Sequence, residues 1–535
     1  MKTALPRIFV TLLLTSFFSA KAQFKQIAAG PQFEEPATGN ARLLQMSNGN
    51  TVFVHFTTKE GYNIRVYDAT HTEKVVANYA PAYERFNVPP KESAYSFYTP
   101  NHEIVRGFFE LNNECVLFIE EADKKKTALY RVTLDLTTGK PKEEKELFVL
   151  KKEGRFRVVK SPVGEGYSIL ILGTIANADK SAGGPQVYLY DKLHKEINKA
   201  VCISPESDKE HEILDYQDMA MTGTGSVCLF FTAYSGKYGA PGTCYMMVLG
   251  KSGAPGFQKL NLPPDLLYRE IYANYNPVSD KIICLAVTEI KKESGDFNLY
   301  MNIIDPAAKT AKDIKGFLPG DQVNEAYKST FDKKKDYSGL PQQIAVNNDG
   351  SFSIIYEEVG SLSQGDGGGY GRKDTKLGKM VVVTLDKDGK WKSSYLVPKA
   401  HWILFTSLYA FYYRLQSADL VELFRGNQYK SFNYLSTKGG SYLFINDSER
   451  NNEVKNDKLV EIQGMENCDA FSYKLGGADI IPRRDYFFGQ PAKGHALALF
   501  QASDYDSQTG VYVTLKLVKE SARDNQVTLV WMQMQ

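Results

Sequence analysis

The sequence predicts an all-β protein, a propeller of four-stranded antiparallel blades with eight blades, or seven if a terminal unit is incomplete. Three observations recur along the chain from residue 40 onward. A dense apolar run follows a Gly- or Asn-containing turn signal, and an amphipathic strand ending in Asp comes after it. Equal β units repeated along one chain can bury their faces only against one another, which is typical of a propeller.

The apolar runs define the second strand of each predicted blade. They are mostly continuous rather than alternating, so each must be covered on both faces, as the inner strands of a blade are by its two neighbours. Their mean spacing is about 63 residues, which exceeds the ~40–50 residues of a bare blade and leaves a surplus for loops. The runs lie at residues 52–56, 115–119, 169–172, 227–231, 282–287, 352–356, 442–445 and 496–500.

The turns support the same repeat. Gly and Asn, as in Asn48-Gly49-Asn50, tolerate the positive φ that short hairpins need. Asp at the end of a third strand can accept backbone hydrogen bonds and begin a turn. The segment Asp135-Leu136-Thr137-Thr138-Gly139-Lys140 resembles the D-x-x-T-G-K turn of many β-propeller families, although no GH…WD pattern of a WD40 protein is present. Residues 24–30 are predicted to add a strand that helps close the ring.

The first 22 residues have the features of a secretory signal peptide. Lys2 and Arg7 form the basic region, residues 8–18 the short apolar region, and Ala20-Lys21-Ala22 the cleavage site. The signal resembles those of exported proteins of the Bacteroidetes type, and it predicts a periplasmic, cell-envelope or secreted protein. Residues 23–535 are predicted to form a single propeller domain, in which no segment is apolar for long enough to span a bilayer.

Composition limits the partners. The 64 basic and 62 acidic residues give a net charge of +2, so no excess of positive charge is available for phosphate backbones and nucleic-acid binding is not expected. The six cysteines and seven histidines show no metal-binding spacing. We therefore predict neither a metal nor a cofactor, and we interpret the cysteines as buried small hydrophobic residues.

The long connections should share one face of the propeller. First-to-second and third-to-fourth turns are short, whereas second-to-third loops and blade links are long, and the two sets alternate between faces. The largest predicted insertions are residues 318–343, 357–378 and 399–432. Because function concentrates in long loops held on rigid scaffolds, a binding site is expected on that face, near the axis.

Aromatic and charged residues of these loops are the candidate ligand-binding residues. In 399–432, Trp402, Tyr409 and Tyr412 have helical spacing, although a strand remains an alternative. The segment forms either an aromatic platform for a sugar or protein partner or a small satellite core. Tyr370 lies in a glycine-rich segment that lacks a complete dinucleotide-binding pattern.

Near another loop, Arg483 and Arg484 could clamp an anion, and Asp485 beside them is a further candidate ligand-binding residue. Paired carboxylates suitable for acid–base chemistry would come from a further set of acidic residues: Asp215, Asp218, Asp321, Glu325 and Asp485.

The sequence predicts a non-catalytic exported binding or scaffolding protein with a protein or glycan partner. The alternative is a propeller-type enzyme, a glycan or peptide hydrolase or lyase that uses carboxylates on the loop face. A third interpretation is a structural partner within an outer-membrane complex. A deep axial site with two carboxylates would favour the enzyme, whereas an open aromatic surface would favour the binding protein.

Overall fold

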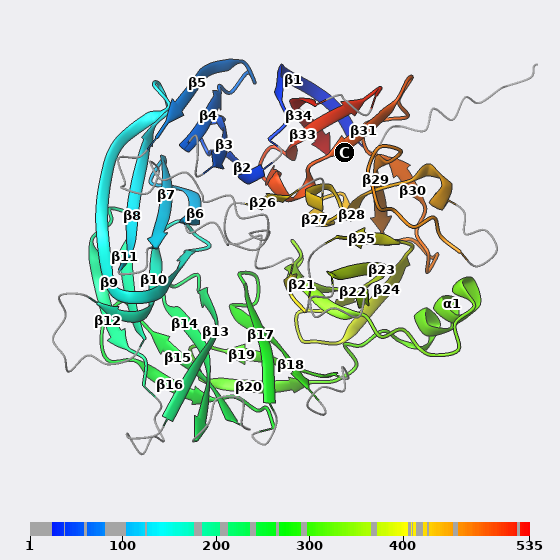
Figure 1. Cartoon of the computed structure of the whole chain (residues 1–535). Helices are drawn as coiled ribbons and strands as arrows, with labels where there is room; N and C mark the ends of the chain where they lie inside the picture. Colours follow the sequence, from blue (N-terminus) through cyan, green and yellow to red (C-terminus); the bar gives the residue numbers. More distant parts are fainter. Residues whose placement is uncertain are drawn as a thin grey trace, which may run out of the picture.

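The protein is a β-propeller with eight four-stranded antiparallel blades around a central axis (Figure 1). The computed structural model describes residues 24–36, 38–57, 61–80, 103–122, 126–175, 185–203, 212–235, 242–263, 267–289, 297–364, 372–404, 408, 410–412, 421–424, 427–452, 458–521 and 525–534. Within these ranges one α-helix occurs, α1 (Asp321–Phe331), in the link between blades 5 and 6. No helix there is long and apolar enough to cross a membrane.

The first four blades follow the chain, and each begins with its innermost strand. One long strand serves two blades: β9 is the outermost strand of blade 2 in its first part and the innermost strand of blade 3 in its second part. The strands of blade 1 are β2 (Thr38–Gln45), β3 (Thr51–Thr57), β4 (Gly61–Tyr67) and β5 (Glu73–Tyr79). Blades 2 and 3 contain β6 (Glu103–Leu111), β7 (Glu114–Ala122), β8 (Lys126–Asp135), β9 (Lys140–Lys160), β10 (Gly166–Ile175), β11 (Gln186–Asp191) and β12 (Glu196–Val201). Blade 4 contains β13 (Glu212–Met221), β14 (Val227–Ser235), β15 (Gly242–Leu249) and β16 (Gly256–Lys259).

The next three blades keep the same order, and short extra elements attach to them. Blade 5 contains β17 (Leu267–Asn276), β18 (Lys281–Glu289), β19 (Phe297–Asp305) and β20 (Thr310–Ile314). Blade 6 contains β21 (Leu340–Val346), β22 (Phe352–Gln364), β23 (Arg372–Leu385) and β24 (Trp391–Val397). Blade 7 contains β27 (Asn433–Thr437), β28 (Gly440–Asp447), β29 (Asp469–Leu475) and β30 (Arg484–Tyr486). The extra strands are β25 (His401–Ile403), which pairs with β23, and β26 (Val421–Phe424), which pairs with β2; the short 3₁₀ helices are η2 (Asn427–Tyr429), η3 (Glu449–Asn452) and η4 (Phe500–Ala502).

Blade 8 closes the ring by joining both ends of the described chain. Its strands from the axis outward are β31 (His495–Ala498), β33 (Val511–Lys519), β34 (Gln526–Met534) and β1 (Phe24–Glu34), and β32 (Asp504–Asp506) pairs with β33. The predicted closing strand at residues 24–30 is confirmed, since β1 pairs with β34 from Phe24↔Met534 to Glu34↔Gln526. The prediction that 496–500 is a second strand is wrong: it forms the innermost strand, because β1 supplies the outermost place.

The core lies between the blades, which explains the continuous apolar runs. In β18, Ile282, Cys284 and Ala286 are buried against blade 4. The alternate residues Ile283, Leu285 and Val287 are buried against blade 6. Every residue of the run is therefore covered, as the sequence pattern predicts. All six cysteines are buried and none is bonded to another.

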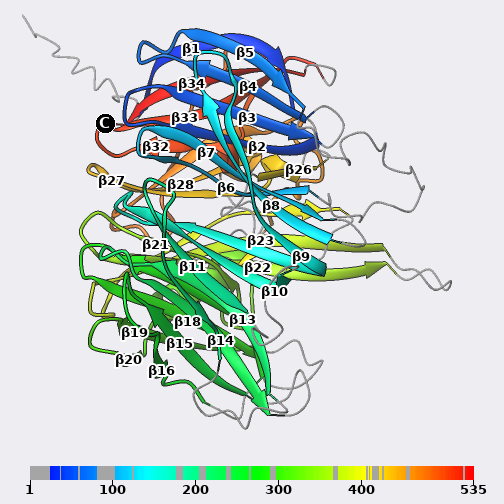
Figure 2. The ribbon, with the colours of Figure 1, turned by 90° about the vertical axis from the view of Figure 1, so that its left-hand side faces the viewer.

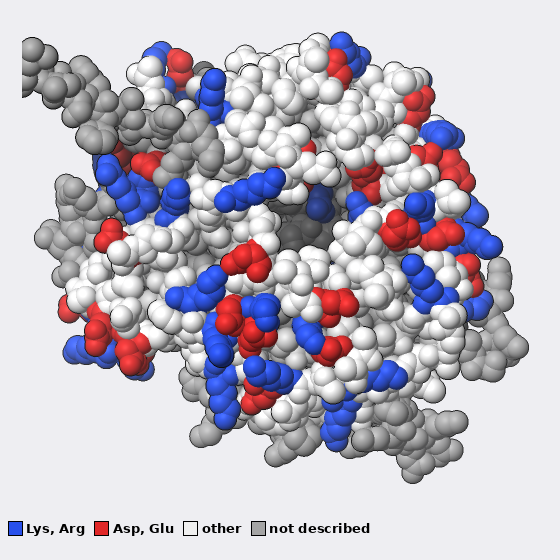
Figure 3. All heavy atoms as spheres, turned by 180° about the vertical axis from the view of Figure 1, so that it is seen from behind, with Lys and Arg blue, Asp and Glu red and all other residues white. Residues whose placement is uncertain are grey.

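The turns and loops divide the propeller into two faces. The turns between first and second strands and between third and fourth strands lie on what we call the short-turn face, and the other connections lie on the loop face. Figure 2 shows the ring from its side, with β22 and β23 projecting from the loop face. Figure 3 shows the short-turn face, which is hollowed at the centre of the ring.

The Asp-led turns on the short-turn face form as predicted. Asp68 Oδ1 accepts hydrogen bonds from the backbone N–H groups of Thr70 and Thr72 at 2.9 and 3.0 Å. Asp386 accepts equivalent bonds from Asp388 and Lys390 at 2.9 and 2.8 Å. Such local bonds fix a tight turn, so this face is rigid.

The predicted insertions contain more regular structure than their sequences suggested. Segment 357–378 is mainly a continuation of the β22–β23 hairpin, whose ladder extends to Gln364↔Arg372. Segment 318–343 contains α1 and the start of β21, and segment 399–432 contains β25, β26 and η2. In the described parts of these insertions, strand pairing satisfies backbone polar groups, which a composition rich in Gly and polar residues does not reveal.

Candidate functional site

Trp402 lies on a strand and not on a helix. Trp402 lies on β25 and is half-buried; its indole N–H donates to Glu461 Oε2 at 2.9 Å, and Lys376 Nζ lies 5.8 Å from its ring centroid. Tyr370 and Tyr409 lie outside the described residues. Of the candidate aromatic residues that the structure describes, Trp402 is therefore the one whose side chain is partly exposed.

Tyr412 is part of the interior between blades 6 and 7. Its ring is buried in a hydrophobic cluster with residues of both blades. Its hydroxyl donates to Glu357 Oε2. Glu357 Oε1 is 2.6 Å from Lys399 Nζ, and both of these charged side chains are fully buried. The segment therefore anchors blade 6 through a buried ion pair, and little of Tyr412 remains for a ligand.

The three consecutive charged residues at the start of β30 alternate in exposure, Arg483 immediately preceding the strand. Arg483 and Asp485 are exposed, whereas Arg484 is buried. Arg484 Nη1 lies 3.0 Å from Asp447 Oδ2, and its guanidinium stacks 4.0 Å from the ring centroid of Phe471. Its Nη2 donates to the carbonyl oxygens of residues 448 and 449 at 2.8 and 3.0 Å. The donors of Arg484 thus hold blade 7 together instead of facing an anion.

Most of the candidate carboxylates are separated by the fold. Asp321 and Glu325 are exposed on α1. Asp218 is fully buried and accepts a hydrogen bond from the backbone N–H of Ala273 at 2.6 Å. Asp215 is the exception, because it lies on the innermost strand β13 and keeps part of its side chain exposed.

Asp215 belongs to a charged cluster on the innermost strands of three successive blades. Arg157 comes from the second part of β9, Asp215 from β13 and Glu270 from β17, and all three are half-buried. Each innermost strand runs from the loop face to the short-turn face. Asp215 and Glu270 lie in the first half of their strands, whereas Arg157 lies in the second half of the part of β9 that pairs with β10. Gln217 Nε2 donates to Asp215 Oδ2 at 3.0 Å and orients that carboxylate. The two carboxylates of this axial cluster therefore lie toward the loop-face end of the axis.

The electrostatics of the axial cluster distinguish Glu270. Burial and the neighbouring carboxylate of Asp215 raise the pKa of Glu270 to about 6, and the guanidinium of Arg157 lowers it in part. A carboxyl group that changes charge near neutral pH can donate or accept a proton under ordinary conditions. Together the three side chains offer acceptors, a donor and a titratable acid to a polar ligand.

β-bulges shape the innermost strands at the level of the axial cluster. The register shifts by one residue in β6, β13, β17 and β21. The extra residue is long and polar in every case: Arg106, Gln217, Arg269 and Gln342. Bulges re-aim side chains and are frequent beside functional sites. Among these four residues, Gln217 contacts the axial cluster, whereas Arg106 and Gln342 are buried, Arg106 in an ion pair with Glu120.

Sequence reasoning identified Asp215 but missed Arg157, Gln217 and Glu270. A usable signal existed, since the first strand of each repeat is more polar than the second and becomes the innermost strand. Listing the charged residues of all first strands would have included the whole cluster. Within the described residues, no group of three His, Cys, Asp or Glu side chains could hold a metal ion.

Comparisons with known proteins find only distant similarity to this chain. No family model matches the sequence, and no curated protein matches it. A structure of a protein from Lactobacillus plantarum is 9% identical over 82% of this chain and 92% of its own, with a TM-score of 0.35. An ulvan lyase is 10% identical over 69% and 87%, with a TM-score of 0.38. A lectin from Burkholderia pseudomallei is 11% identical over 68% and 99%, with a TM-score of 0.29. The function must be inferred from the residues of this chain.

Proposed function

We propose that this protein is an exported binding protein of the periplasm or cell envelope, and that it takes a polar ligand at the loop-face end of its axis. The axial cluster of Arg157, Asp215 and Glu270 carries the proposal. Export is supported by the signal-peptide features of residues 1–22.

The chemistry of the axial cluster suits a hydroxyl- or amide-rich ligand. Carboxylates accept hydrogen bonds from hydroxyl groups, and a guanidinium donates to ring or carbonyl oxygens. The groups are held on strands rather than on loops, so little conformational entropy is lost when a ligand binds. A glycan or an extended peptide offers the alternating donors and acceptors that such a set can pair with.

A binding screen with matched variants tests this proposal. Wild-type protein and the variants Asp215→Asn, Glu270→Gln and Arg157→Gln would be applied to glycan and peptide arrays, and each hit would be measured by calorimetry. We expect each substitution to weaken the binding of a hit about tenfold or more, because each removes a charge-assisted hydrogen bond. Asp313→Asn, on the exposed outer strand β20 of blade 5, should bind as wild type does. Unchanged binding in all three axial variants would refute the axial site.

One observation favours an enzyme as the second candidate. The pKa of about 6 at Glu270, beside a second carboxylate, suits a general acid in glycan or peptide cleavage or elimination. Incubation of each bound glycan or peptide with the protein, followed by detection of new chain ends, separates the two functions. An enzyme would yield product that Glu270→Gln abolishes while binding persists. Binding without product in the wild type would identify a binding protein.

A further inference from the structure

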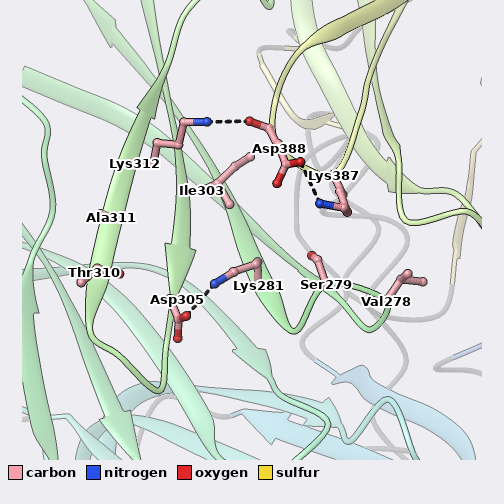
Figure 4. Close-up of a pocket in the computed structure, with 10 residues that line it drawn as sticks. All are labelled: Val278, Ser279, Lys281, Ile303, Asp305, Thr310, Ala311, Lys312, Lys387 and Asp388. Carbon is pink, nitrogen blue, oxygen red and sulfur yellow. Dashed lines mark hydrogen bonds and ion pairs between the residues drawn. The ribbon is translucent and has the colours of Figure 1, made fainter.

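A groove lies between blades 5 and 6 on the short-turn face, away from the loop-face site (Figure 4). Its volume is about 500 Å³, within the range of pockets that hold small organic molecules. The wall from blade 5 includes Lys281 and Asp305, and the wall from blade 6 is the turn with Lys387 and Asp388. Ile303 supplies an apolar side chain between them.

Two contacts between the blades lie beside the groove. At the inner end, Asn276 Nδ2 donates to the carbonyl oxygen of Gly350 at 2.7 Å, and a Cβ atom at Gly350 would lie only 2.8 Å from Val278 Cγ1. At the outer end, Lys312 Nζ donates to the carbonyl oxygen of Asp388 at 3.0 Å. Both contacts hold the two blades together beside the groove.

The charges that line the groove do not cancel. Lys281 Nζ lies 2.5 Å from Asp305 Oδ2, and Lys387 Nζ lies 2.7 Å from Asp388 Oδ2, so each of these lysines has its own carboxylate. The hydrogen bond of Lys312 goes to a neutral carbonyl oxygen instead. The third ammonium group leaves one positive charge in excess at the outer end, where it favours an anion.

We propose that this groove is a second binding site, which takes a small organic anion with an apolar face. The acidic group of the ligand lies at Lys312, where it replaces or joins the carbonyl oxygen as acceptor. The apolar part lies over Ile303 and Val278, and the two lysine–aspartate pairs form polar walls on either side. The site does not depend on the axial cluster.

A fluorescence titration with 1-anilinonaphthalene-8-sulfonate, an aromatic sulfonate, tests the site. We expect wild-type protein to bind this probe and Lys312→Gln to bind it about tenfold more weakly. Lys390→Gln is the matched control, because Lys390 is an exposed lysine of the turn that carries Lys387 and Asp388 and does not line the groove. Lys390→Gln should bind the probe with wild-type affinity. Glu270→Gln should do so as well, because the groove does not include the axial cluster, so the two proposed sites are tested separately.

Two further measurements distinguish specific binding from general apolar adsorption. The neutral analogue N-phenyl-1-naphthylamine should bind wild type more weakly than the sulfonate, and Lys312→Gln should remove that difference. Hydrogen–deuterium exchange should show protection by the sulfonate at residues 277–281 and 386–390. Equal affinity of wild type and Lys312→Gln, equal affinity for charged and neutral probes, or protection elsewhere would overturn the proposal.

Discussion

The carboxylate of Asp218 on β13 accepts a 2.6 Å hydrogen bond from the backbone N–H of Ala273 on β17, and thereby joins the innermost strands of blades 4 and 5. Similar bonds link other blades. Glu120 of blade 2 accepts from the N–H of Phe156 in blade 3 at 2.9 Å. Asn446 of blade 7 exchanges two bonds of 2.8 Å with the backbone of Ala498 in blade 8. Innermost strands have an unpaired edge, and buried side chains of the preceding blade satisfy part of it.

Replacing Asp218 should therefore loosen the ring. Asp218→Ala leaves the buried N–H groups of Met219 and Ala273 without their acceptor, and we expect a loss of about 2–4 kcal/mol in unfolding free energy. Urea denaturation measures it. Asp485→Ala removes an exposed carboxylate of blade 7 and should change stability by less than about 0.5 kcal/mol. Equal effects of the two substitutions would contradict the bridging role.

Phe24 should be essential for ring closure. It is 6% exposed on β1, and its ring centroid lies 5.1 Å from that of Phe487 and 5.2 Å from that of Tyr442. Phe24→Ala should cost about 3–5 kcal/mol and promote association through the uncovered edge of β34, as measured by thermal unfolding and gel filtration. Ile27→Ala on the same strand, where the side chain is 42% exposed, is the control and should have little effect.

Glu270 should make stability depend on pH. Its pKa in the folded protein, about 6, exceeds its ordinary value of 4.5, so folding favours the protonated form. The stabilising contribution is complete below pH 4.5 and is lost as the pH rises through 6. Glu270→Gln should therefore be about 1–2 kcal/mol more stable than wild type at pH 8 and no different at pH 4.

Urea denaturation at both pH values measures this difference. Glu325→Gln, at an exposed position on α1, provides the control and should follow the wild-type curve. A stabilisation by Glu270→Gln that is equal at pH 4 and pH 8 would exclude ionisation as its cause.

Breaking the buried pair Lys399–Glu357 should cost more stability than breaking an exposed pair. Lys399→Met leaves Glu357 charged and buried, and we expect a loss of about 3–5 kcal/mol. The double variant Lys399→Met/Glu357→Gln should recover most of it, because the amide still accepts from the Tyr412 hydroxyl. Lys392→Met breaks the exposed pair with Asp349 and should cost less than about 1 kcal/mol. Chemical denaturation of wild type and the three variants measures these free energies of unfolding. A double variant no more stable than Lys399→Met would contradict the idea that the unpaired charge of Glu357 causes the loss.

The fold was more predictable than the candidate site. The burial of runs such as 282–287 in β18 can be predicted from local composition, since residues covered on both faces must all be apolar. The last run, 496–500, was predicted to be a second strand instead of an innermost strand, because the innermost strand of blade 8 is as apolar as the second strands of other blades. The aromatic spacing of 399–412 suggested a helix, but Trp402 is paired with Lys376 in a sheet. Tertiary pairing there outweighs the local pattern.

The sequence by itself determined an eightfold β repeat, the turns that divide it and the N-terminal strand that closes the ring, because each follows from the order of apolar, polar and turn-forming residues along a short segment. Only the tertiary structure decided which charges meet. Arg157, Asp215 and Glu270 come from three blades, and Lys312 and Asp388 from two, so their proximity depends on how blades pack around the axis. Coulomb interaction and burial depend on distance in space, which no local pattern records.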